Sequence, residues 1–549
     1  QKIIDLKKQT NLLIDELKSV CADAGLGNDG NEYKIITEIF LYKFINDKFI
    51  YELKNTIASS LFWLPAETNP EKYLANLSKE NYDILMIRLN ENVARLKPNQ
   101  FISNIFNKQD ERDFSKIFDD NLISIAKDND NIFSQLTSGG KKIPIFESIS
   151  QYIRDNPNEF CKAIVNKLIN FSFEKFFEKD QKFDFYATIF EYLIKDYNSN
   201  SGGTDYAEYF TPHSVAKIMA TCLNTKKANN VTCYDPASGS GTLLMNIANS
   251  IGDENCTIFS QDISQKSSKF LRLNLILNNL VHSIPNAIQG NTIRDPYHKD
   301  NNMNLKTFDF IVSNPPFKTD FSEYRNDLDS NENKDRFFAG IPKITPKDPK
   351  KMEIYLLFIQ HIIFSLSENG KAAIVVPTGF LTSKSGIGRK IREFLVEKKF
   401  LRGAISMPDN IFANTGTKVS ILFLDKESKF ENVLFIDATK EGTKIKDENK
   451  KQKTLLSTED EKKIINTFVN NNVVDDFSVY VKLDSIKDKK YSFSAGHYFE
   501  VKHNFESISL KEFKEINDLF KKDLTKLSEE NDKIEKEIYE NLKKIKYEN

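Results

Sequence analysis

Asn314, Pro315, Pro316 and Phe317 are the residues whose types and spacing best suit chemistry, and they directly follow the apolar stretch 308–313. Two consecutive prolines fix their own φ angles and keep the preceding residue extended, so we expect the Asn314 amide at the carboxyl end of a strand. Ligands bind at this edge in open α/β sheets. There the amino group of an adenine can donate to the Asn314 side-chain oxygen and the Pro315 carbonyl, while Phe317 stacks on the ring. Two acceptors on one amino group aim its lone pair at an electrophile, which is chemistry by positioning and electrostatics.

The stretch YDPASGSGTLL (234–244) has the composition of a tight turn between a strand and a helix. Glycines at 239 and 241 permit a sharp turn and let a ligand approach the backbone with no Cβ in the way. Leu244 stands at the third glycine of the dinucleotide fingerprint GxGxxG, and no GxxxxGK[ST] triphosphate loop is present at this turn. The turn therefore argues against a dinucleotide and a nucleoside triphosphate, and taken alone such a turn often only packs a helix on a strand.

Asp262 ends the next expected strand, where a carboxylate can accept hydrogen bonds from the ribose hydroxyls of a cofactor at the Gly-rich turn. Taken alone, an aspartate here is more often a helix N-cap, and an Asn-Pro dipeptide often only starts a loop. The order of a Gly-rich turn, an acidic strand end and then Asn-Pro-Pro-Phe favours one functional site over unrelated loops.

The elements that must position these residues alternate after residue 215. We expect helices at 215–223, 241–250 and 264–279, and strands at 231–235, 256–261, 308–313 and 372–376. This alternation predicts a parallel sheet wound in right-handed crossovers. Residues 1–195 carry apolar side chains at helical spacing, which predicts a helical N-terminal domain, and the Ser/Asn/Gly-rich stretch 198–205 marks the boundary. The polar stretch 320–351 is too long for an idle connection and predicts a functional or mobile loop.

The C-terminal segment has apolar or asparagine residues at alternating steps of four and three. They are Phe520, Leu524, Leu527, Asn531, Ile534, Ile538, Asn541 and Ile545. This spacing is typical of a coiled-coil seam, in which core asparagines fix register or partner number. A lone amphipathic helix packed on its own domain is an equally good interpretation.

Composition limits the classes of protein that fit. The chain has 549 residues, too many for one hydrophobic core, so we expect two or three domains. Its net charge of −1 gives no global basic field, so any DNA contact must be local or shared with a partner.

No apolar run approaches a membrane span, and the first residues do not resemble a secretory signal, so we expect a cytoplasmic protein without membrane contact. The five scattered cysteines predict neither disulfides nor a metal site.

These motifs resemble those of the N6-adenine DNA methylases, and within them the modification subunits of type I restriction-modification systems. DPASGSGTLL is similar to their cofactor motif and NPPF to their catalytic motif. EYFTPHSVAKIMA (208–220) resembles a segment that closes over the methionine part of the cofactor, and QGNTIRDP (289–296) a third motif that brings Asn291 near its adenine. Stretches at 369–381, 389–397, 405–426 and 491–500 follow the family's order. Asp262 departs from the common glutamate, the variant SGSGT departs from many relatives, and nothing after residue 500 matches.

The resemblance implies a multidomain α/β protein. It comprises a helical N-terminal domain (1–195), a Rossmann-like S-adenosylmethionine-dependent methyltransferase domain (196–500) and a C-terminal helical, coiled-coil-like tail that binds a partner (501–549). It implies methyl transfer from S-adenosyl-L-methionine to N6 of a flipped adenine in double-stranded DNA. A separate specificity subunit would read the sequence and carry two copies of this chain. Whether a restriction subunit joins the complex stays open.

The resemblance also implies a set of site residues. The expected catalytic residues are Asn314, Pro315, Pro316 and Phe317. The expected cofactor-binding residues are Glu208, Tyr209, Phe210, Thr211, Pro212, His213, Asp235, Pro236, Ala237, Ser238, Gly239, Ser240, Gly241, Thr242, Asp262 and Asn291.

Two other functions remain. One is an amino methyltransferase acting on protein glutamine or ribosomal RNA, although such enzymes are shorter and do not need the helical N-terminal half. The other is a catalytically inactive DNA-binding scaffold, against which the intact motifs argue. Lys318, Arg325, Lys334 and Arg336 are candidates for phosphate contacts, although a solvated loop explains any single one.

Overall fold

The structure is a computed structural model that describes residues 2–27, 30–58, 69–177, 192, 211–412, 417–446, 452–499 and 509–545. The chain divides into two compact units, Gln1–Tyr498 and Phe499–Asn549. In the described residues no helix is both long enough and apolar enough to cross a membrane.

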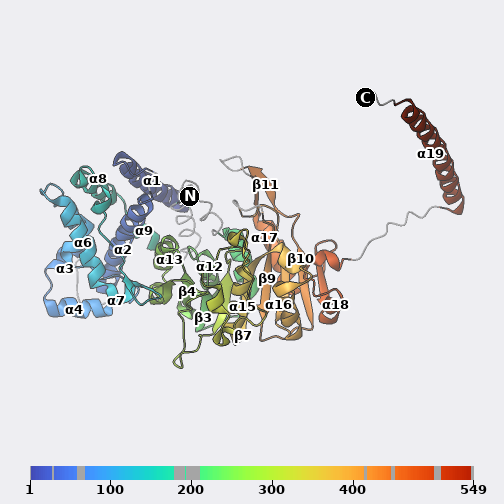
Figure 1. Cartoon of the computed structure of the whole chain (residues 1–549). Helices are drawn as coiled ribbons and strands as arrows, with labels where there is room; N and C mark the ends of the chain where they lie inside the picture. Colours follow the sequence, from blue (N-terminus) through green and yellow to red (C-terminus); the bar gives the residue numbers. More distant parts are fainter. Residues whose placement is uncertain are drawn as a thin grey trace. The chain divides into compact units, whose positions relative to one another are not determined.

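The N-terminal part of the first unit is helical, as predicted (Figure 1). Its helices are α1 (Lys2–Asp23), α2 (Glu32–Ala58), α3 (Pro70–Ala75), α4 (Lys79–Arg88), α5 (Ile102–Phe106), α6 (Phe114–Asp128), α7 (Asp130–Phe133), α8 (Pro157–Ile169) and α9 (Glu174–Phe177). Buried aromatic rings hold them together: Phe173 packs edge-on against Phe40 and Phe44, with ring centroids 5.2 and 5.5 Å away. Two short strands that the sequence did not indicate, β1 (Gln135–Thr137) and β2 (Lys142–Ile143), also lie in this region.

One sheet of eleven strands runs through the first unit in the order β13-β10-β8-β9-β7-β6-β3-β4-β5-β1-β2. Its remaining strands are β3 (Val231–Asp235), β4 (Cys256–Asp262), β5 (Ala287–Gln289), β6 (Phe308–Ser313), β7 (Leu366–Pro377), β8 (Leu401–Ser406), β9 (Val419–Asp425), β10 (Asn432–Asp437) and β13 (Ser478–Lys482). The prediction of a parallel sheet is confirmed for β3, β4, β6 and β7, but the sheet as a whole is mixed, because β9 lies antiparallel between β7 and β8, and β13 and β2 are antiparallel at the two edges. The strands that carry the motifs, β3, β4 and β6, are parallel.

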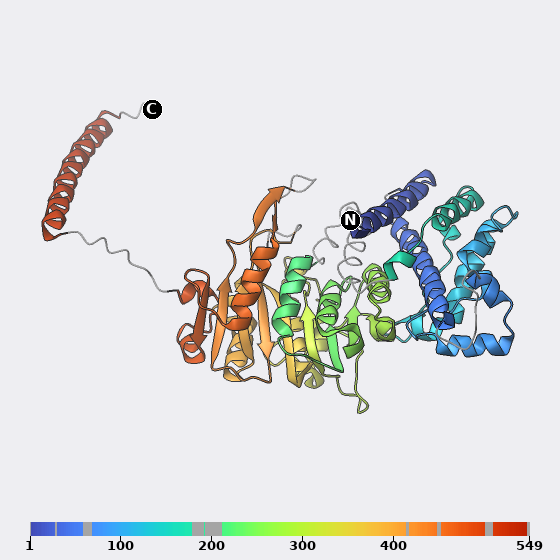
Figure 2. The same ribbon diagram turned by 180° about the vertical axis from the view of Figure 1, so that it is seen from behind.

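Helices cover both faces of the sheet (Figures 1 and 2). On one face lie α11 (His213–Leu223), α12 (Thr242–Ile251) and α17 (Thr458–Asn470), and on the other α15 (Tyr355–Phe364) and α16 (Gly386–Glu397). The apolar side chains of α15 are almost all buried, which explains why this segment of the sequence is a continuous apolar run. The described part of the first unit ends after α18 (Leu483–Asp488) and a short turn.

Helix α13 (Gln265–Leu277) joins the N-terminal helices to the sheet through buried charges. Lys269 Nζ lies 3.3 Å from Glu38 Oε1 and 3.2 Å from Glu147 Oε2. The Arg272 guanidinium, 3% exposed, donates to the carbonyl oxygens of Phe133, Ile143 and Ile145, at 3.5, 2.9 and 3.4 Å. Buried charges need such partners, so these bonds fix α13 relative to the N-terminal part.

The second unit contains α19 (Leu510–Lys544), whose N-terminus is a capping box formed by Ser509 and Glu512. None of its residues is buried, and its seam residues Phe520, Leu524 and Ile534 are 65%, 72% and 56% exposed. A helix with such an apolar stripe normally packs against another element.

We expect Arg272→Ala to destabilise the protein by about 3 kcal/mol, because three carbonyl oxygens in or near the core lose their donor and Glu38 loses a nearby positive charge. Thermal and urea unfolding followed by circular dichroism measure this change. The control is Arg294→Ala, since the Arg294 side chain is 49% exposed. Equal unfolding midpoints for the two variants would contradict the bridging role of Arg272.

Candidate active site

The ends of β3, β4 and β6 bring the predicted motifs together at one edge of the sheet. Asp235, Asp262 and Ser313 are the last residues of these neighbouring strands, and Asn314 follows directly. A cavity of about 1700 Å³ opens at this edge. Its lining includes the predicted site residues Pro236, Ala237, Gly239, Asp262, Asn291, Asn314, Pro315, Pro316 and Phe317.

The Gly-rich turn is built as the sequence predicted. Gly239 and Gly241 have φ angles of 51° and 87°, in the left-handed region that favours glycine. A Cβ at Gly241 would lie 2.3 Å from Leu271 Cδ1, so this glycine also permits α12 and α13 to pack closely. Ser240 and Thr242 follow the same turn into α12, while Ser238 is buried.

Asp262 supports this turn directly. Its Oδ2 accepts from the Gly239 backbone N–H at 2.8 Å, and its Oδ1 accepts from that of Ser264 at 2.8 Å. Burial raises the pKa of Asp262, and these two hydrogen bonds partly offset the effect. The N-cap of α13 is Ser264, so the simple capping role considered for Asp262 belongs to another residue. Each carboxylate oxygen has a second lone pair that can accept from a ligand.

Asp235 connects the Gly-rich turn to the Asn-Pro-Pro-Phe motif. It is 1% exposed and accepts from the Ala237 backbone N–H at 2.9 Å and from Ser313 Oγ at 2.8 Å. Burial raises the pKa of Asp235 to about 7. Since Ser313 precedes Asn314, Asp235 lies behind the cavity and fixes the relative position of the two motifs.

The Asn314 side chain is fixed by the segment that precedes α11. Asn314 is 7% exposed, and its Nδ2 donates to Thr211 Oγ1 at 3.2 Å. Within the part of the chain that the structure describes, the Asn314 side chain makes no other hydrogen bond. Its Oδ1 is therefore available to accept from a substrate. Pro212 is the N-cap of α11 and His213 its first residue. Glu208, Tyr209 and Phe210 lie outside the described residues.

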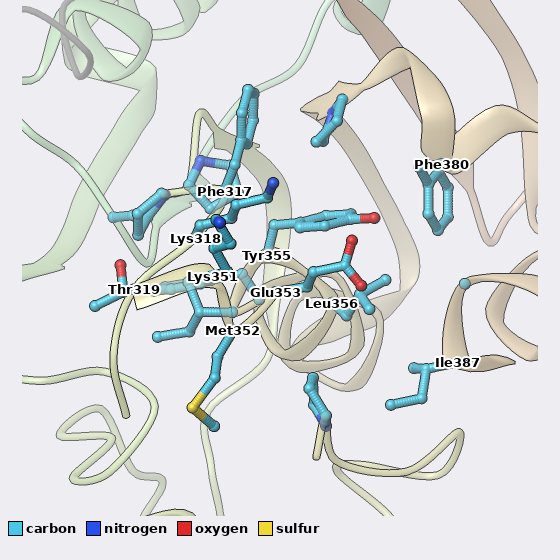
Figure 3. Close-up of a pocket in the computed structure, with 18 of the residues that line it drawn as sticks. Phe317, Lys318, Thr319, Lys351, Met352, Glu353, Tyr355, Leu356, Phe380 and Ile387 are labelled. Carbon is cyan, nitrogen blue, oxygen red and sulfur yellow. The ribbon is translucent and has the colours of Figure 1, made fainter. Parts of the chain in front are cut away.

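Aromatic rings surround the part of the cavity next to Phe317 (Figure 3). The Tyr355 ring lies between Phe317 and Phe380, with both centroid distances 6.2 Å and both pairs edge-to-face. Of these three rings, the sequence indicated Phe317 alone. Tyr355 begins α15 and Phe380 follows β7, and no local pattern indicated that either would face this cavity.

The stretch 320–351 is a packed segment with its own apolar cluster. Phe321, Leu328 and Phe337 are buried against residues of α15 and its N-terminal approach. Tyr324 of this segment lines the cavity, and its hydroxyl accepts from Asn291 Nδ2 at 3.1 Å. Asn291 Oδ1 accepts from the backbone N–H groups that follow it, so the third motif is held by its own turn and by this segment.

Arg336 has a structural role, so it is neither the candidate phosphate contact nor the solvated loop residue that the sequence suggested. It is 2% exposed, and its Nη atoms donate to the carbonyl oxygens of Thr292 and Ile293, both at 2.8 Å. Its Nε donates to His361 Nδ1 at 3.0 Å, so the proton of this imidazole is on Nε2, 3.1 Å from the Tyr234 hydroxyl. Burial lowers the pKa of Arg336 to about 10 and holds the pKa of His361 well below its usual value, so the imidazole is neutral. Arg336 thus joins the stretch 320–351 to Thr292 and Ile293 and, through His361, to Tyr234.

The other three candidates for phosphate contacts differ in whether their side chains are already bonded. Lys318 lines the cavity and Lys334 is not buried. Arg325 donates to the Pro342 carbonyl and pairs with Asp329 at 3.1 Å, so its side chain is already engaged. The sequence indicated the correct region but not which of its basic residues face solvent.

Comparisons with known proteins match the part of the chain that contains these motifs. The family model described as N-6 DNA Methylase matches residues 181–507. The type I restriction enzyme MpnII methylase subunit of Mycoplasma pneumoniae is 30% identical over 342 residues, which is 61% of this chain and 60% of that protein. The type I restriction enzyme MjaVII methylase subunit of Methanocaldococcus jannaschii is 24% identical over 544 residues, which is 96% of this chain and 85% of that protein. The first alignment thus spans less than two thirds of the relative's length.

A solved structure supports the same fold. The type I restriction-modification system methyltransferase subunit from Streptococcus thermophilus superposes with a TM-score of 0.70 at 20% identity, covering 91% of this chain and all of that one. Because the family model matches more than half of the chain and its motifs meet at one cavity, the chain belongs to the N-6 DNA Methylase family.

Proposed function

We propose that this chain is the modification subunit of a type I restriction-modification complex and methylates N6 of an adenine in double-stranded DNA. The observation that carries this proposal is the Asn314 amide, held by Thr211 beside the Gly-rich turn and facing an aromatic cavity. An adenine can reach such a cavity only after it leaves the base stack. The same proposal includes three domains, with the bounds 1–195, 196–500 and 501–549, and a cytoplasmic location.

The residues at one end of the cavity fit S-adenosyl-L-methionine. Gly239 leaves the backbone of the turn open to a ligand, the Asp262 carboxylate suits ribose hydroxyls, and Asn291 lines the same end. When bound, the cofactor supplies a methyl group on a positively charged sulfur. Thr211, which directly precedes Pro212 and α11, contacts Asn314 of the second motif.

The other end of the cavity suits a flipped adenine. The Asn314 Oδ1 and the Pro315 carbonyl accept from the N6 amino group, and Phe317 stacks on the base. These acceptors stabilise the positive charge that develops on N6 during transfer, and they need no strong base. Tyr355 and Phe380 extend the aromatic surface around the base.

The proposal includes a specificity subunit that carries two copies of this chain. The exposed seam of α19 is the surface that we expect to pack on helices of that subunit.

The direct test is transfer of a tritiated methyl group from S-adenosyl-L-methionine to genomic DNA, with and without the co-purified specificity subunit. We expect label on N6-methyladenine only with the partner. Asn314→Ala should lower the rate about 100- to 1000-fold, because an acceptor for the developing charge is lost. Asn326→Ala, in α14 (Arg325–Leu328) on the surface, is the control.

Other results would select the other candidate functions. Label on protein glutamine or on ribosomal RNA would identify the chain as a different amino methyltransferase. DNA binding with no transfer under any condition would identify an inactive scaffold.

Gly241→Ala should weaken binding of S-adenosyl-L-methionine about tenfold or more. The new Cβ would stand in a left-handed conformation and 2.3 Å from Leu271 Cδ1, so the turn must shift. Gly252→Ala is a matched control, because Gly252 also has a positive φ, 106°, but lies at the other end of α12. Calorimetric titration with the cofactor measures both, and equal affinities for the two variants would oppose the assignment of the turn.

Leu524→Glu combined with Ile538→Glu should abolish co-purification with the specificity subunit, because charges enter an apolar seam. Lys522→Glu combined with Lys536→Glu changes the opposite side of α19 and should leave the complex intact. Size-exclusion chromatography of the co-expressed subunits measures assembly. A complex that survives the first pair of substitutions, or deletion of 510–549, would remove α19 from the interface.

A further inference from the structure

A two-stranded hairpin projects from the same edge of the sheet as the candidate active site. Its strands are β11 (Thr443–Lys446) and β12 (Gln452–Leu455), and it follows β10. β10 is parallel to β8, β8 and β7 are both antiparallel to β9, and β7 is parallel to β6. β10 and β6 therefore end at one edge, and β11 extends beyond that edge (Figures 1 and 2).

The base of the hairpin is fixed near the rim of the cavity. Thr454 is 2% exposed; its Oγ1 donates to the Asp409 carbonyl at 2.6 Å and its backbone N–H to the Asn410 carbonyl at 3.0 Å. Asp409 also pairs with Lys418 at 3.4 Å, and the neighbouring Thr417 lines the cavity. The hairpin thus has a defined position beside the substrate end of the site.

The hairpin is basic in a chain of nearly zero net charge. Residues 438–456 contain six lysines and three acidic residues, whereas the whole chain has a net charge of −1. Glu441 at the base is already paired with Lys463, at 2.7 Å. Lys444 and Lys446 are exposed and Lys453 is half-buried, and within the described residues none of the three pairs with a carboxylate.

This arrangement contributes little to the core. All four residues of β11 are exposed, including Ile445 at 37%. An isolated two-stranded ribbon is only marginally stable. Packing therefore does not explain why this hairpin projects from the sheet and carries lysines. The major groove of B-DNA, about 12 Å wide, admits such a ribbon, and lysines bind its phosphates.

We propose that the β11–β12 hairpin binds the sugar–phosphate backbone of duplex DNA beside the flipped adenine. The proposal rests on the proposed function, since a base in the cavity brings the duplex to this edge of the sheet. An acidic protein surface is the other occupant that lysines fit. DNA is favoured because Thr417 and the anchored base of the hairpin adjoin the cavity that the base must enter.

The test is the triple variant Lys444→Gln, Lys446→Gln and Lys453→Gln in the assembled complex, with DNA affinity measured by fluorescence anisotropy at several salt concentrations. The slope of log affinity against log salt should decrease in magnitude by about 2 to 3, because each phosphate that a lysine no longer neutralises removes about 0.9 from it. Affinity should fall about tenfold or more and equally for cognate and unrelated duplexes, because phosphates carry no sequence information. The affinity for S-adenosyl-L-methionine should not change.

The matched control is Lys299→Gln, Lys398→Gln and Lys482→Gln, three exposed lysines at the opposite edge of the sheet. A salt slope of the hairpin variant equal to that of the control would overturn the proposal. Dissociation of the specificity subunit from the hairpin variant would also overturn it and assign the hairpin to a protein partner. Methylation by the wild-type complex, measured alongside, separates these results from failure of the proposed function.

Discussion

The hydrogen bond between Thr211 and Asn314 is the interaction on which the site depends. An amide side chain has one acceptor end and one donor end, and only the acceptor end suits an amino group that must keep its lone pair for an electrophile. In the structure the donor end is bound to Thr211, in a position that is 4% exposed. Thr211 therefore selects which atom of Asn314 meets the substrate.

The surrounding structure makes this arrangement rigid. Asp235 accepts from Ser313, so the residue before Asn314 cannot move independently of the Gly-rich turn. On the other side, Arg336 ties the stretch 320–351 to the carbonyls of Thr292 and Ile293, and Gln360 accepts from the Ala339 N–H at 2.8 Å. A buried arginine is costly unless its donors are satisfied, and hydrogen bonds to two carbonyl oxygens and one imidazole satisfy that need here. These hydrogen bonds thus hold the residues next to Asn314 and next to Asn291 in place.

Local patterns predicted the parts of the structure that local forces determine. The strands 231–235 and 308–313 and the positive φ angles at the Gly-rich turn are as the sequence indicated, because apolar strands and glycine turns are encoded by neighbouring residues. The antiparallel β9 was not predicted, since its pairing is decided by strands distant in the sequence.

The parts of the site that depend on long-range packing were also missed. Tyr355 and Phe380 reach the cavity only because β7 pairs with β6 and α15 packs on β7. The burial of Arg336 depends on His361, which is 25 residues away. The polar composition around Arg336 indicated a surface position. No neighbouring residue in the sequence indicated that its side chain is buried.

The most direct test of the central claim compares Thr211→Val with Thr211→Ser in the assembled complex, by kcat for methyl transfer and by Kd for S-adenosyl-L-methionine. Thr211→Val keeps the shape but cannot accept from Asn314 Nδ2, so kcat should fall about 10- to 100-fold with little change in Kd, while Thr211→Ser should restore most of the rate. An unchanged kcat for Thr211→Val, or a loss confined to cofactor affinity, would contradict the account.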